Sequence, residues 1–145
     1  MVTINFLAVL VVAVVDMVLG SIWYGPLFMN AWGRIIGVDM NSMTPEKKKE
    51  MQKKMWPTYL LNFVLALLTA YVLAKFIYMS APVPGASGGM MIAFWIWLGF
   101  LMPMAAGASM WGGKPKKLAW QMFWITAIFQ LIAALVGGAI LGAWQ

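Results

Sequence analysis

The chain has 145 residues, of which 63% are hydrophobic and only 10% are charged, and its formal net charge is +6. A surface that faces water needs more charge than this, so the composition excludes an ordinary soluble globular protein and indicates an integral membrane protein. Because the sequence contains no cysteine and no histidine, it has no thiolate nucleophile and no imidazole. We therefore expect no enzyme, no cofactor and no metal site.

Four apolar runs are each long enough to cross a hydrocarbon core, which needs about 20 helical residues. They cover approximately residues 3–25, 58–79, 88–111 and 118–144. They predict an all-α, polytopic membrane protein, with four transmembrane helices in a single domain at residues 1–145. The connection at residues 26–57 is expected to be a basic helical segment on the cytoplasmic side.

The first run ends at Trp23-Tyr24-Gly25-Pro26. Trp and Tyr prefer the headgroup layer, and Pro suits a helix that stops, kinks or restarts. This segment is typical of a helix leaving the membrane, and residues 27–38 after it suggest a short helix lying in the interface.

A second helix is expected to begin within the connection, capped by Ser42 or Thr44, with Pro45 at its first position. It would run through the lysines until Pro57 bends it into the second span. A short, rigid turn at residues 80–85 is expected to join the second and third spans on the other side.

Nine of the ten basic residues lie in the two connections on one side of the predicted helices. This asymmetry predicts that both termini face outward and that the basic connections face the cytoplasm. Because the lysines sit between apolar runs, we expect membrane lipid and no nucleic acid as a partner. The basic residues expected to face lipid are Lys47, Lys48, Lys49, Lys53, Lys54, Lys114, Lys116 and Lys117.

Small residues recur every fourth position in the third and fourth spans, at Gly99, Pro103 and Gly107 and at Ala134, Gly138 and Gly142. Such stripes let helices approach closely, and they exceed what one four-helix bundle needs, so they predict a homo-oligomer. Pro103 also frees a carbonyl near Gly99. A proline-broken helix of this kind lines the substrate site in some transporters, which leaves a ligand groove open as the alternative to packing.

The Trp23-Tyr24-Gly25-Pro26 exit has a partial counterpart in Trp97-Leu98-Gly99 and Pro103. Each is followed by a basic connection and then by an apolar run. This pattern predicts two like-oriented helical hairpins, although shared topology signals alone would also produce it.

Asp16 is an ionisable residue inside the first apolar run. It lies about 20 Å along a helix that starts near residue 3, past the midplane toward the cytoplasm. Asn62, Gln121 and Gln130 are the other strongly polar residues in the spans. Since Asn62 and Gln121 have similar depths to Asp16, we expect these three to form an intramembrane polar site. It would be either an interhelical hydrogen-bond clamp or a proton or cation site.

The sequence resembles the family of small four-helix membrane proteins known as domain of unknown function 1761. The resemblance rests on residues 23–28 followed by Trp32, on residues 59–61 and 70–74, on residues 97–100, and on residues 138–144. It implies a compact four-helix protein of a bacterial membrane, with no assigned activity and no catalytic residue to carry over.

Two functions fit these observations. The first is an oligomeric transporter or channel for a small solute or ion, with Asp16, Asn62, Trp23, Tyr24 and Pro103 near its pathway. The second is a structural or accessory membrane protein that binds anionic lipid or a partner through its basic cytoplasmic face.

The predicted topology can be tested by cysteine labelling, because the chain has no native cysteine. Cysteines introduced at Ser42 and at Gln145 should react with an impermeant reagent from opposite sides of the membrane. Labelling of both positions from outside intact cells would contradict the orientation.

Overall fold

The computed structural model describes residues 3–80 and 85–144. Over these residues it is helical and contains no strand. The elements in order are α1 (Phe6–Ile22), the π-helical turn η1 (Trp23–Leu27), α2 (Met29–Ile36), α3 (Pro45–Met79), α4 (Gly85–Ile96), the π-helical turn η2 (Trp97–Leu101), α5 (Met102–Trp111) and α6 (Lys116–Ala143).

Four helical stretches are long and apolar enough to cross a membrane, which confirms the predicted fold class. They are Phe6–Leu27, Pro45–Met79, Gly85–Trp111 and Lys116–Ala143. The turn expected at residues 80–85 falls largely on residues 81–84, which lie outside the described residues, as does Gln145.

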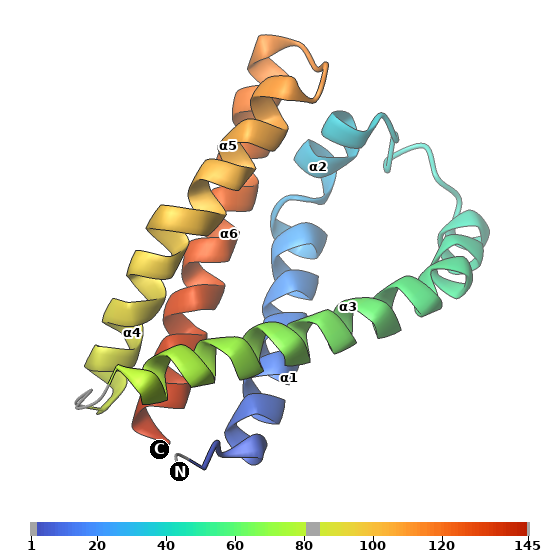
Figure 1. Ribbon diagram of the computed structural model, residues 1–145. Coiled ribbons are helices and arrows are strands. Elements are labelled where there is room, and N and C mark those ends of the chain that lie inside the picture. Colours follow the sequence, from blue (N-terminus) through green and yellow to red (C-terminus); the bar gives the residue numbers. More distant parts are fainter. Residues whose placement is uncertain (1–2, 81–84, 145) are drawn as a thin grey trace.

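The helices form a bundle from which α3 diverges (Figure 1). The continuous α4–η2–α5 rod runs antiparallel to α6, and α1 lies on the other side of α6. Helix α3 crosses α1 obliquely. The described ends of the chain lie at one end of the bundle, whereas α2 and the α5–α6 turn lie at the opposite end.

Side-chain caps fix where α1 and α3 begin. The Asn5 side chain accepts hydrogen bonds from the backbone N–H groups of Leu7 and Ala8, and its Nδ2 donates to the Trp144 carbonyl at 3.2 Å. The Thr44 side chain caps α3 by accepting from the Lys47 N–H at 3.3 Å. Of the two caps that the sequence allowed for α3, the structure uses Thr44.

Helix α3 passes through Pro57 without interruption. The predicted connection at residues 26–57 and the predicted span at residues 58–79 therefore share one helix. Residues 52–62 are all exposed, whereas Ala70, Ala74 and Ile77 are buried against the bundle. Only the second half of α3 contributes to the core, and its first half projects away (Figure 1).

The close contact between α4 and α6 is made by glycine. A Cβ at Gly89 would overlap the Gly138 carbonyl, and a Cβ at Gly138 would overlap the Gly89 carbonyl and lie 2.7 Å from Ala93 Cβ. Gly142 meets the Gly85 carbonyl in the same way. The stripe predicted at Gly138 and Gly142 therefore packs inside the protomer, against glycines of α4 that the sequence pattern did not single out.

The stripe predicted in the third span is placed differently. No atom beyond the local helix lies within 4 Å of a Cβ built at Gly99 or Gly107, and Pro103 is exposed. These residues do not pack against another helix of the described chain. The surface that these small residues form therefore lies on the outside of the bundle.

We predict that Gly138→Ala destabilises the bundle, because the new methyl group would collide with a backbone carbonyl that a side-chain rotation cannot move. Overpacking of this kind costs about 1–3 kcal/mol. Unfolding in detergent micelles would measure the change. Gly107→Ala is the matched control, and it should leave the stability unchanged or slightly higher, because its Cβ meets nothing. Equal stability of the two variants would contradict the packing role.

Candidate functional site

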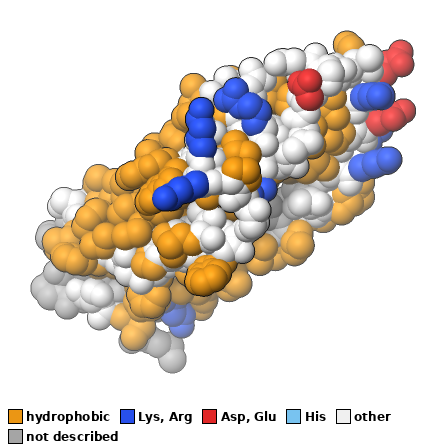
Figure 2. Space-filling model, turned by 90° about the horizontal axis from the view of Figure 1, so that it is seen from above, with side chains coloured by type: hydrophobic (Ala, Val, Ile, Leu, Met, Phe, Trp, Pro, Cys, Tyr) orange, Lys and Arg blue, Asp and Glu red, His pale blue; other side chains and the backbone are white. Residues whose placement is uncertain are grey.

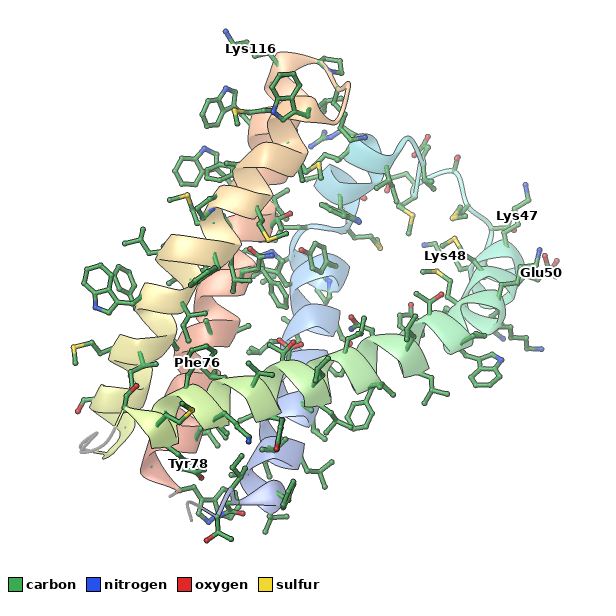
Figure 3. All side chains as sticks on the ribbon, viewed as in Figure 1. Lys47, Lys48, Glu50, Phe76, Tyr78 and Lys116 are labelled. Atoms are coloured by element: carbon green, nitrogen blue, oxygen red, sulfur yellow. The ribbon has the colours of Figure 1, made fainter. Side chains whose placement is uncertain are left out.

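A cleft of about 500 Å³ opens between α1, α3, α4, η2 and α6. It exists because α3 touches the bundle through its second half and then diverges (Figure 1). Four of its lining side chains are polar, namely Asp16, Asn62, Thr69 and Gln130, and the rest are apolar or glycine. Phe76, which also lines this cleft, lies where α3 crosses the bundle (Figure 3).

The Asp16 side chain is half-buried on the inner face of α1. The same face of the helix carries Val12 and Ala13, which are buried, and Gly20 one turn later. Within residues 3–80 and 85–144, the carboxylate has no hydrogen-bond or ion-pair partner. A carboxylate in an apolar region without a partner is costly, so its position on a cleft is the feature that requires explanation.

The other polar groups of the cleft offer mainly acceptors. The Asn62 Nδ2 atom donates to Met17 Sδ at 3.1 Å, and the Thr69 hydroxyl donates to the Leu65 carbonyl at 2.9 Å. The Gln130 Oε1 atom is buried and accepts no hydrogen bond. The cleft therefore holds a carboxylate and an amide oxygen that are free to accept.

The structure does not bring Gln121 to Asp16 and Asn62. Gln121 lines a separate cavity of about 550 Å³ with Phe28, Lys117 and Trp120, and its buried Oε1 atom also lacks a partner. The residue of α6 that joins Asp16 and Asn62 is Gln130. The expected three-residue site thus has a different third member, since similar depth along a helix does not fix which face a side chain occupies.

An aromatic cluster adjoins the cleft on the side of α2. Phe129, which lines the cleft, has its ring centroid 6.2 Å from that of Trp23 and 5.4 Å from that of Tyr24. The Trp23 ring also contacts the Phe28 ring in a tilted arrangement, with centroids 4.6 Å apart, and the Tyr24 and Trp32 rings meet edge to face at 4.9 Å. The aromatic exit that the sequence indicated is therefore continuous with the cleft through Phe129, a residue that sequence reasoning did not single out.

Gly25 and Pro26 produce the kink at this exit. Gly25 has φ −93° and ψ −107°, which lies outside the helical region and is accessible to a residue without Cβ. The chain then restarts as α2 at Met29 and ends that helix at Gly37, which has φ +80°. Lys114 holds α2 in place by donating from Nζ to the Ile35 carbonyl at 2.7 Å.

The two related segments of the sequence share a hydrogen bond but differ in backbone conformation. In Trp23–Leu27 the N–H of Phe28 donates to the Trp23 carbonyl, and after Trp97–Leu101 the N–H of Met102 donates in the same way to the Trp97 carbonyl. The first segment is broken at Gly25, which has non-helical φ and ψ, whereas the second continues as a helix. Both indoles also bind α6. Trp23 Nε1 donates to the Ile125 carbonyl at 3.0 Å, and Trp97 Nε1 donates to the Ala127 carbonyl at 2.9 Å. These bonds fix both sides of the cleft to one helix.

The basic residues lie apart from the cleft. Lys47 and Lys48 are on the projecting end of α3 and Lys116 is at the start of α6 (Figure 3). Viewed from the α2 end, basic side chains lie among apolar ones, with acidic side chains beside some of them (Figure 2). Lys75, the basic residue within residues 58–79, lies over the Tyr71 ring at 5.5 Å and does not line the cleft.

Residues 7–142 match the family described as "Protein of unknown function (DUF1761)". Comparison with the curated proteins and with the solved structures gave no match. The family match includes the cleft, the aromatic cluster and both π-helical turns.

We predict that Trp23→Phe and Trp97→Phe each destabilise the protein by about 1 kcal/mol, because each change keeps a ring but removes the hydrogen bond to α6. The measurement is unfolding of the purified variants in detergent. Trp124→Phe serves as the control, since Trp124 is 56% exposed. If all three variants unfolded alike, the indole bonds would have no stabilising role.

Proposed function

The chain belongs to the family described as "Protein of unknown function (DUF1761)", and since that description assigns no activity, we propose from its cleft that it is a transporter or channel for a small solute or ion. The observation that carries this proposal is the Asp16 carboxylate, which lines a cleft between apolar helices without a partner of its own. Intramembrane ionisable residues that face a cavity are typical of substrate and ion pathways.

The proposal includes assembly into a homo-oligomer in a bacterial cytoplasmic membrane, with both termini outside and the basic connections in the cytoplasm. One four-helix protomer encloses little space for a continuous pathway. Gly99, Pro103 and Gly107 form a surface of small residues against which no helix of the described chain packs. Such a surface supports this proposal, because small residues let a helix of another copy approach closely. We propose no enzymatic activity, as the sequence lacks cysteine and histidine.

A second candidate function is that of an accessory protein that binds anionic lipid or a partner. It is favoured by the basic residues of the α3 start and of the α5–α6 turn, since exposed Trp56, Trp111 and Trp120 follow or flank them in the sequence. Figure 2 shows basic side chains among apolar ones on this face. Each such residue near an anionic membrane contributes about 1 kcal/mol of attraction. This function makes no use of the Asp16 cleft, so the two candidates are separated by variants of that residue.

We predict that reconstituted protein catalyses flux of at least one solute in a panel of Na⁺, K⁺, H⁺ and small organic ions, and that Asp16→Asn reduces this flux at least tenfold. The change keeps the size of the side chain but removes the charge that could exchange with a solute. Proteoliposome flux assays would measure it. Asp39→Asn is the matched control, because Asp39 is exposed in the α2–α3 connection. Flux no greater than in protein-free vesicles, or equal flux in both variants, would contradict transport through this cleft.

A further inference from the structure

The charge balance of the cleft favours a cation. Among its lining residues there is one carboxylate, Asp16, and no lysine or arginine. Gln130 adds a buried oxygen with no donor, and the Asn62 amide nitrogen is already directed to Met17 Sδ. A ligand that carries positive charge would satisfy these acceptors, whereas an anion would meet a carboxylate in a region of low dielectric.

The apolar lining favours an organic cation over a metal ion. A small metal ion needs about six oxygen ligands to replace its water shell. The cleft offers few oxygens, and most of its wall is formed by side chains such as Leu19, Leu65 and Leu101. Its volume of about 500 Å³ is in the range that holds drug-sized ligands. A cation with an apolar body would match both the charge and the wall.

An aromatic ring is placed to contribute to such a site. The Cζ atom of Phe129 lies 3.6 Å from the position of a Cβ on Gly20, which is one turn beyond Asp16 on the same face of α1. The ring therefore stands between the Asp16 turn and the Trp23 and Tyr24 rings. Aromatic faces attract quaternary cations through their quadrupole.

We infer that the Asp16 cleft binds a hydrophobic organic cation, with the Asp16 carboxylate as its counter-ion and the Phe129 ring as its aromatic contact. This inference rests on the proposed transport function for its site, but it concerns binding, which can be measured without transport. Phe129 would also separate the bound cation from the aromatic cluster at the exit of α1.

The test is equilibrium binding of tetraphenylphosphonium to the full chain in lipid nanodiscs, with tetraphenylborate as an anion of the same shape. We expect saturable binding of the cation and only lipid partitioning of the anion. Asp16→Asn should weaken cation binding at least tenfold, whereas Asp16→Glu, which keeps the charge, should retain most of it. Asp39→Asn is the control for lost charge outside the cleft.

Phe129→Leu should weaken cation binding about two- to thirtyfold, as expected for loss of a cation–π contact. Phe100→Leu is its matched control, because Phe100 is 68% exposed and does not line the cleft. Thermal unfolding of each variant establishes that it is folded.

Saturable binding of the anion, or cation binding that Asp16→Asn leaves unchanged, would overturn the inference. Displacement of the cation by Na⁺ or K⁺ with loss of all Phe129 dependence would overturn it in favour of a metal-ion site. If Asp16-dependent flux of another solute were found without cation binding, the inference would be wrong and transport would stand. If Asp16-dependent cation binding were found without flux of any solute, the inference would stand and the transport proposal would be wrong.

Discussion

The contact between Gly89 of α4 and Gly138 of α6 determines how the rest of the protein can be arranged. It brings two backbones together at a distance that no side chain would permit. Helix α6 is thereby fixed against the α4–η2–α5 rod, and it can serve as the common support of the bundle. The indoles of Trp23 and Trp97 then bind carbonyls of α6 that are two residues apart, at Ile125 and Ala127. Residues 23–27 and 97–101 are therefore both anchored to the same helix, α6.

The cleft follows from this arrangement together with the composition of α3. Ala70 and Ala74 let the second half of α3 approach α1 and α6 closely, and both are almost fully buried. The first half contains larger apolar side chains, such as Leu60 and Leu61, that remain exposed. Two helices that cross obliquely separate on either side of their contact, and the first part of α3 in addition changes direction (Figure 1). The space between them is where Asp16, Asn62 and Gln130 lie.

Sequence reasoning predicted what depends on local chemistry or on length. The four spans follow from apolar length, the α3 cap from Thr44 and Pro45, and the kink from Gly25 and Pro26. It did not predict the third polar residue of the cleft. Gln121 and Gln130 are nine positions apart, which places them on opposite faces of a helix with 3.6 residues per turn, so only one can face Asp16. Which one does so depends on the rotation of α6, and that is set by the Gly89 and Gly138 contact between distant segments.

The cleft differs from the rest of the spans in holding a carboxylate, whereas the buried residues elsewhere are mostly apolar. Outside the cleft, the indole N–H groups of Trp23 and Trp97 find carbonyl acceptors, whereas buried oxygens of Ser109, Gln121 and Thr126 have no partner within the described residues. At the cleft a carboxylate and a buried amide oxygen have no partner within the described residues. Two aliphatic residues would pack there at lower cost. Local rules that are broken without an internal compensation are expected at functional sites. A partner for these acceptors must supply positive charge or hydrogen-bond donors. The unpartnered groups therefore indicate the chemistry of the ligand that the cleft would bind.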